Sequence, residues 1–221
     1  MKIITYSLIL TSFIILSCEF STFYRKPHTN RLKINDDYMI TPNSLRLNLL
    51  TKYTKDHYGE PYIYLDNPEM IVIHSTETKT LNVAVNVFQR EILIGRKDIH
   101  YGGEVNVGTH FLVDTNGEIY KSTPTDYIVR HTIGFNHKSI SIENIGYAGQ
   151  LTKEQLKANI ELIKYLKQKY SSIKYVIGHY EYMDNTRPHF RLYKELNSKY
   201  IPTIKSDPGS NFIYNIRKNL N

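Results

Sequence analysis

Short apolar runs alternate with helical patterns through the middle of the chain. Residues 70–73 are all apolar and lead into His74, which predicts a buried strand. Apolar residues at helical spacing follow and predict an amphipathic helix that covers this strand. They are Leu81, Ala84, Val85, Phe88 and Ile92.

The next segments predict a hairpin and then a strand with two unlike faces. Residues 109–113 and 118–122 flank an Asn116-Gly117 dipeptide, which is the strongest short signal for a hairpin. Over residues 139–144, Ser139, Ser141 and Glu143 alternate with Ile140, Ile142 and Asn144. Because side chains alternate across a strand, we expect Glu143 to share a face with the two serines and to line a cleft.

A further helix and strand complete the pattern. Thr152, with Gln155 three residues later, predicts a capping box at the start of a helix. Leu156, Ile160, Ile163 and Leu166 or Lys167 then recur at helical spacing, and residues 173–177 predict a strand that ends just before His179. We therefore expect an α/β fold, with a mixed central β-sheet flanked by helices.

The first residues predict export. Lys2 precedes an apolar stretch over residues 3–16, which has the length of a signal-peptide core and is short for a transmembrane helix. Ser17-Cys18 then resembles a bacterial lipoprotein box, which implies cleavage before Cys18 and lipidation of that residue. The alternative is an ordinary signal peptide with an incidental cysteine. Cys18 is the only cysteine, so no disulfide forms within the chain.

The predicted organisation has four parts. A lipoprotein signal peptide spans residues 1–17, and the lipidated Cys18 with a flexible, polar tether spans 18–37. An N-terminal extension that packs on the domain spans 38–68, and a single catalytic domain spans 69–221. The signal peptide and the lipid anchor predict a location in a bacterial cell envelope, at a membrane and on its periplasmic side. We also expect the protein to be a monomer.

Charge narrows the class of partner. The net charge of +7 favours encounter with polyanions, such as peptidoglycan, an anionic membrane surface or nucleic acid. The sequence carries no recognisable nucleic-acid-binding motif, so we expect no nucleic-acid partner.

Two histidines and a late polar motif could form a zinc site. His74 and His179 each close an apolar run, and Asp207 lies in Lys205-Ser206-Asp207-Pro208-Gly209. A catalytic zinc ion usually takes three protein ligands of the His and carboxylate type and leaves a fourth position open. Each residue alone is weak evidence, because a strand-end histidine is usually not a ligand and Asp-Pro-Gly is by default a turn.

Six stretches in order resemble the zinc-dependent N-acetylmuramoyl-L-alanine amidases, a group that includes phage lysozyme-type amidases and, more distantly, peptidoglycan recognition proteins. They span roughly residues 70 to 209 and are Ile71 to Thr76, Thr109 to Asp114, Arg130 to Gly134, Ser139 to Glu143, Val176 to His179 and Lys205 to Gly209. The resemblance implies the fold of that family, a zinc ion, and peptidoglycan or muropeptides as substrate.

The resemblance also implies a role for individual residues. His74, His179 and Asp207 would hold Zn²⁺, Glu143 would take the proton from the attacking water, and Lys205 would face the oxyanion. His131 would contact substrate or orient a ligand, and His110 would be structural. We expect the other histidines on the surface; they are His28, His57, His100, His137 and His189.

Some features depart from the family pattern. An insertion at about residues 182–203 separates His179 from Asp207, and it supplies Asp184 and His189 as rival third ligands. Arg130 stands where many relatives have tryptophan, and Ser141 where many have glycine. The expected function is hydrolysis of the amide bond between N-acetylmuramic acid and L-alanine. The alternatives are a non-catalytic peptidoglycan-binding lipoprotein of the same fold and a surface lipoprotein that binds a partner through its tyrosine-rich loops.

Overall fold

The computed structural model describes residues 32–220. The predicted signal peptide, the lipidation site Cys18, the tether as far as residue 31, and His28 lie outside these residues and stay predictions. Within residues 32–220, no helix has the length and apolar character needed to span a membrane.

A five-stranded sheet forms the centre of the described domain. Its strands are β1 (Met70–Ser75), β2 (Phe111–Val113), β3 (Ile119–Lys121), β4 (Ser139–Asn144) and β5 (Tyr175–Gly178). The order is β3-β2-β4-β1-β5. Only the β2–β3 pair is antiparallel, and it is the hairpin predicted at Asn116-Gly117; the other pairs are parallel. The predicted mixed sheet is therefore confirmed.

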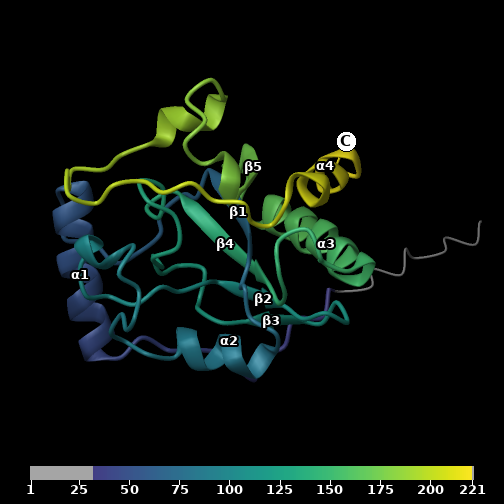
Figure 1. Ribbon diagram of the computed structural model, residues 1–221, viewed down its shortest axis with the longest axis horizontal. Helices are drawn as coiled ribbons and strands as arrows, with labels where there is room; N and C mark the ends of the chain where they lie inside the picture. The colour runs from purple at the N-terminus through teal and green to yellow at the C-terminus, as the bar shows by residue number, and fades with distance from the viewer. Residues whose placement is uncertain (1–31, 221) are drawn as a thin grey trace, which may run out of the picture. The chain divides into compact units, whose positions relative to one another are not determined.

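Four helices cover the two faces of the sheet. They are α1 (Ser44–Tyr58), α2 (Leu81–Phe88), α3 (Lys153–Lys169) and α4 (Ser210–Lys218). In Figure 1, α3 and α4 lie on one side of the sheet, and α1 and α2 lie on the other. Three short 3₁₀ turns, η1 (His100–Gly102), η2 (His179–Glu181) and η3 (Pro188–Leu192), lie in the loops.

Helix α2 covers a different part of the sheet from the part predicted. Its buried residues pack with Leu112 of β2 and Tyr120 of β3, and not with β1. Leu50 and Tyr53 of α1 belong instead to the cluster that contains β1. The helix also ends at Phe88, so Ile92 lies beyond it and is 47% exposed.

Helix α3 is capped as predicted, and its buried stripe contains two of the predicted residues, Ile163 and Leu166, together with polar residues that were not predicted. Thr152 and Gln155 form the capping box. Leu156 and Ile160 are only half-buried, whereas Gln155 and Asn159 are fully buried. The amide nitrogen of Gln155 donates to the carbonyl oxygen of Ile145 at 2.8 Å, and that of Asn159 donates to Asn144 Oδ1 at 2.6 Å. These hydrogen bonds satisfy the buried side-chain amides, so polar residues can lie on the buried face of α3. A search for apolar residues at helical spacing does not find them.

The described part of the N-terminal region lies on the domain. Asn35 exchanges backbone hydrogen bonds with Ile119 and Lys121, so residues 32–37 do not belong to a tether. The extension over residues 38–68 contains α1, and four of its residues are buried in the main core: Leu50, Tyr53, Tyr58 and Leu65. The insertion also packs inward, with Tyr182, Leu192 and Tyr200 in the same core.

Two histidines that were expected on the surface are buried, so that prediction is wrong for them. His57 is 1% exposed and His189 is 2% exposed. His57 Nδ1 lies 2.8 Å from both carboxylate oxygens of Glu195, and its Nε2 lies 3.0 Å from the carbonyl oxygen of Gly102. Because Glu195 lies in the insertion, the partner of His57 is 138 positions away and invisible to local patterns. His137 is half-buried, and His100 is exposed as expected.

Candidate metal centre and active-site pocket

Three neighbouring parallel strands bring the candidate residues to one edge of the sheet. In the β1–β4 register, His74 lies opposite Glu143. In the β1–β5 register, Ile73 lies opposite Gly178, so His179 follows directly at the end of β5. Because the carboxyl ends of parallel strands meet at the same edge, this topology is sufficient to place the three side chains together.

A backbone hydrogen bond holds Asp207 at this edge of the sheet. The amide of Tyr180 donates to the carbonyl oxygen of Asp207 at 3.1 Å, which fixes the late motif beside η2. Gly209 follows with φ of 101°, and a Cβ there would lie 3.0 Å from the backbone nitrogen of Gly149. Glycine is therefore required for this approach. Helix α4 begins at Ser210 and holds the far end of the motif.

The three predicted ligands form a small triangle of donor atoms. His74 Nδ1 lies 3.1 Å from His179 Nδ1 and 3.3 Å from Asp207 Oδ2, and His179 Nδ1 lies 3.1 Å from Asp207 Oδ2. Ligand atoms at zinc–nitrogen bond lengths on a tetrahedron are about 3.3 Å apart. Two imidazole nitrogens and one carboxylate oxygen at these separations fit one face of a zinc site.

The protonation states of two candidate ligands suit metal binding. Burial, aided by the nearby His74, lowers the pKa of the His179 imidazole to about 4, so this ring is neutral at pH 7. Burial alone would raise the pKa of Asp207, but the neighbouring imidazoles of His179 and His74 hold it well below its usual range. A neutral imidazole and an ionised carboxylate are the forms that bind a metal ion.

The rival ligands lie elsewhere. Asp184 accepts hydrogen bonds from Thr186 and Arg187. The ring of His189 lies against Phe135, with ring centroids 5.8 Å apart. Within residues 32–220, the group of possible metal ligands contains Asp207 and neither of these residues.

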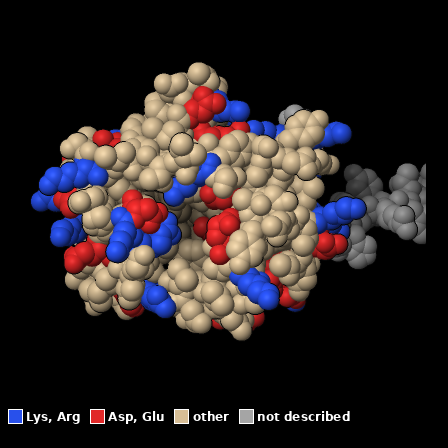
Figure 2. Space-filling model, in the orientation of Figure 1, with Lys and Arg blue, Asp and Glu red and all other residues tan. Residues whose placement is uncertain are grey.

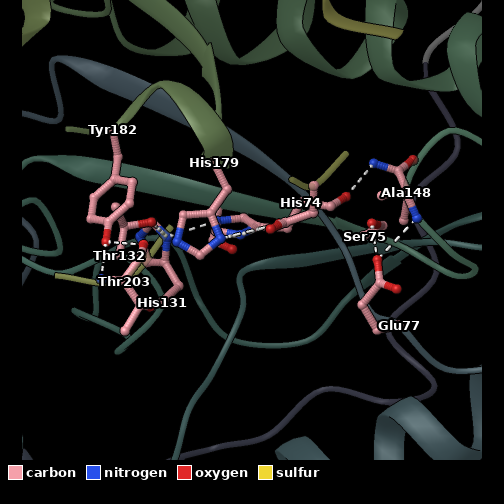
Figure 3. Close-up of polar contacts among 12 residues, drawn as sticks. His74, Ser75, Glu77, His131, Thr132, Ala148, His179, Tyr182 and Thr203 are labelled. Carbon is pink, nitrogen blue, oxygen red and sulfur yellow. Dashed lines mark hydrogen bonds and ion pairs between the residues drawn. The ribbon is translucent and has the colours of Figure 1, made fainter. Parts of the chain in front are cut away.

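His131 contacts the His74 ring and determines which ring nitrogen of His74 carries no proton. Ser139 Oγ donates to the carbonyl oxygen of Phe135, so it accepts from His131 Nε2 at 3.0 Å. Burial, with His74 nearby, holds the pKa of His131 well below its usual value, and its Nδ1 is therefore an acceptor. His74 Nε2 donates to this atom at 3.1 Å, which leaves His74 Nδ1 unprotonated and directed at the ligand triangle (Figure 3).

Glu143 carries an unpartnered carboxylate oxygen into the same pocket. Its Oε2 is buried, and no described residue forms a hydrogen bond with it. Burial raises the pKa of this carboxyl to about 7, and His74 opposes the shift. A carboxyl group that titrates near neutral pH can both accept and return a proton.

A cavity of about 430 Å³ joins these groups. Lys205 lines it, as do Arg96, Glu77 and Tyr200. Sequence patterns did not indicate Arg96 or Glu77, because no recognised motif contains them. Figure 2 shows a hollow near the middle of the face that it presents, with basic and acidic side chains at its edge. The lining carries both signs of charge, with Arg96 and Lys205 against Glu77, Glu143 and Asp207.

His110 lies outside the cavity, in agreement with a structural role. It is fully buried, its Nε2 lies 2.9 Å from the carbonyl oxygen of Tyr127, and its Nδ1 accepts from the amide of Ser141.

Known proteins share this fold. A crystal structure of AmpD superposes with a TM-score of 0.51 at 21% identity, over 71% of this chain and 86% of that one. The amidase LysC from Clostridium intestinale superposes with a TM-score of 0.50 at 23% identity, over 85% of this chain and 97% of that one. A peptidoglycan recognition protein from Trichoplusia ni is 26% identical over 141 residues, which are 60% of this chain and 76% of the insect protein.

The family assignment follows from a match along most of the chain. The model of the N-acetylmuramoyl-L-alanine amidase family matches residues 64–210, a range that contains the whole sheet and all three candidate ligands. The chain therefore belongs to the N-acetylmuramoyl-L-alanine amidase family.

Proposed function

We propose that this protein is a zinc-dependent amidase that hydrolyses the bond between N-acetylmuramic acid and L-alanine in peptidoglycan or muropeptides. The observation that carries the proposal is the triangle of His74 Nδ1, His179 Nδ1 and Asp207 Oδ2, with the unpartnered Glu143 carboxylate in the same cavity. A protein that only bound peptidoglycan would have no need of the buried base, whose burial costs free energy.

Each protein residue has a step in the reaction. A bound zinc ion would supply a Lewis acid that polarises the amide carbonyl and activates water. Glu143 accepts the proton of the attacking water at Oε2 and returns it to the leaving amine of L-alanine. Lys205, in the same lining, places its positive charge near the developing oxyanion. His131 orients the His74 ring through the bond at Nε2.

We also propose that the protein acts as a monomer in the bacterial envelope, tethered through a lipid on Cys18. The apolar stretch over residues 3–16 and the Ser17-Cys18 pair support this location. Cys18→Ala should move the protein from the membrane fraction to the soluble fraction of the producing bacterium. Retention in the membrane fraction would contradict the anchor.

The purified chain should release stem peptides with a free N-terminal L-alanine from muropeptides, and a zinc chelator should stop the release. Glu143→Gln should abolish release while the protein keeps its zinc, because this change removes the base and not a ligand. Glu104→Gln, which alters a side chain that is 69% exposed, is the matched control. If the zinc-loaded protein binds muropeptides and releases nothing, the non-catalytic alternative is correct.

A further inference from the structure

Glu77 lies at the edge of the catalytic cavity in an unfavourable backbone conformation. Its φ is 52°, and among residues 32–220 only one other non-glycine residue, Asn67, has a positive φ. Asparagine tolerates this region well, whereas glutamate does so at a cost. Such costly conformations are retained at functional sites, where the surrounding structure imposes them.

The Glu77 carboxylate is held in one orientation. Its Oε1 accepts a hydrogen bond from Ser75 Oγ at 2.8 Å and another from the backbone amide of Ala148 at 2.9 Å (Figure 3). Both donors are neutral. In the described part of the chain, no lysine, arginine or histidine lies within ion-pair distance of Glu77. Its negative charge is therefore oriented but not neutralised.

The cavity holds carboxyl groups and basic groups together. Glu77 lines it with Glu143 and Asp207, and the basic side chains that also line it are those of Arg96, Arg130 and Lys205. None of these three basic groups lies within ion-pair distance of Glu77. A fixed and uncompensated carboxylate in a substrate pocket attracts a cationic group, and it binds a primary ammonium through a charge-assisted hydrogen bond.

We propose that Glu77 is a specificity residue that binds a primary ammonium group on the peptide part of the substrate. The inference rests on the proposed function for the identity of that substrate. A diamino acid in a stem peptide carries such an ammonium when its side chain is free, and loses it when the amine is acylated in a cross-link. Glu77 thus directs the protein to muropeptides that are not cross-linked through that amine.

A structural role for Glu77 can be separated from ammonium binding. The Ser75 and Ala148 bonds join the end of β1 to the loop before α3, and a purely structural role needs only this link. Glu77→Gln keeps an acceptor oxygen for both donors and removes only the charge. The effect of this variant therefore reports on charge recognition and not on the link.

The test uses two synthetic muramoyl peptides that differ only at a lysine in the third position, with its side-chain amine either free or acetylated. The wild-type protein should hydrolyse the free-amine peptide with a kcat/KM on the order of tenfold higher, as one charge-assisted hydrogen bond allows. Glu77→Gln should bring the ratio of the two values to about one. Because each ratio is taken on one protein, it cancels any effect of the variant on Glu143. The control Glu104→Gln should keep the wild-type ratio.

Equal kcat/KM values for the two peptides on the wild-type protein would overturn the role of Glu77 and leave the amidase proposal intact. If neither peptide is hydrolysed, the amidase proposal fails, and equilibrium binding of the same peptides decides the role of Glu77. Tighter binding of the free-amine peptide that is lost in Glu77→Gln supports it. Equal affinities on the wild-type protein refute it.

Discussion

Arg130 donates hydrogen bonds from Nε at 3.2 Å and from Nη2 at 3.1 Å to the phenolic oxygen of Tyr200. Arg130 is 2% exposed, and its Nη1 also donates to the carbonyl oxygens of Gly103 and Val105. The guanidinium carbon lies 5.5 Å from the centroid of the Tyr53 ring and 5.1 Å from that of the Tyr200 ring. Tyr200 lies in the segment between His179 and Asp207, so this contact joins that segment to the domain.

Removal of this contact should destabilise the domain. Tyr200→Phe leaves guanidinium donors without their acceptor in a buried place, which costs about 1–3 kcal/mol of the free energy of unfolding. Urea denaturation measures the loss. Tyr214→Phe is the matched control, because Tyr214 is 63% exposed and the same oxygen is removed there. Equal stability of the two variants would show that the Arg130–Tyr200 bonds contribute nothing net.

Zinc should stabilise the protein through Asp207 and not through Asp184. A ligand that binds only the folded state at a hundred times its Kd raises the free energy of unfolding by about 2.7 kcal/mol. The Tm should therefore rise when zinc is added to metal-free protein, and Asp207→Ala should remove most of this rise. Asp184→Ala should keep it, since Asp184 is bound to Thr186 and Arg187. The opposite pattern would identify Asp184 as the third ligand.

His131→Phe should weaken zinc binding although His131 is not in the ligand triangle. The change removes the acceptor for His74 Nε2 and so frees the ring orientation and tautomer of His74. Loss of such a partner typically lowers metal affinity 10- to 100-fold. Competition with a chelator of known affinity measures the change, and His100→Phe on the surface serves as control. An affinity equal to that of the wild type would mean that other contacts orient His74.

Lys205→Met should lower kcat without loss of zinc. Removal of one group that stabilises an oxyanion typically reduces kcat by about 10²- to 10³-fold. Lys199→Met provides the comparison, because Lys199 is exposed and does not line the cavity. Steady-state kinetics with a muropeptide, together with zinc analysis of each variant, gives the answer. A Lys205→Met protein with normal kcat would remove Lys205 from the mechanism.

His110 should make the fold sensitive to acid. Burial lowers the pKa of His110 from 6.5 to about 4. Between pH 6.5 and 4, His110 is therefore protonated in the unfolded chain and neutral in the folded chain. The stability due to this residue is complete above pH 6.5 and falls by up to about 3 kcal/mol as the pH drops to 4. His110→Gln, which offers one donor and one acceptor, should flatten the fall in the free energy of unfolding over that range. An unchanged pH profile would contradict the low pKa.

The tautomer of His110 gives a second check. The amide of Ser141 donates to Nδ1, so the proton of the neutral ring lies on Nε2 and is donated to the carbonyl oxygen of Tyr127. Nitrogen NMR of the ring at pH 7 should show this tautomer.

Local patterns predicted the elements well because each depends on neighbouring residues. The strand over residues 70–74, the Asn116-Gly117 hairpin and the Thr152 cap need only a run of apolar residues, a dipeptide or a spacing of three. The same patterns misplaced α2 and missed the polar residues in the buried stripe of α3. Which face a helix buries depends on partners such as Leu112 and Asn144, which come from other parts of the chain.

Sequence alone determined the list of candidate chemical groups, since His74, His179, Glu143, Lys205 and Asp207 stand in motifs with a family order. Only the tertiary structure decided that three of their atoms lie 3.1–3.3 Å apart and that Asp184 and His189 do not join them. The structure also brought Glu77 and Arg96 to the cavity and Arg130 to Tyr200. These distances depend on strand register and on contacts between residues far apart in the chain, which no local spacing encodes.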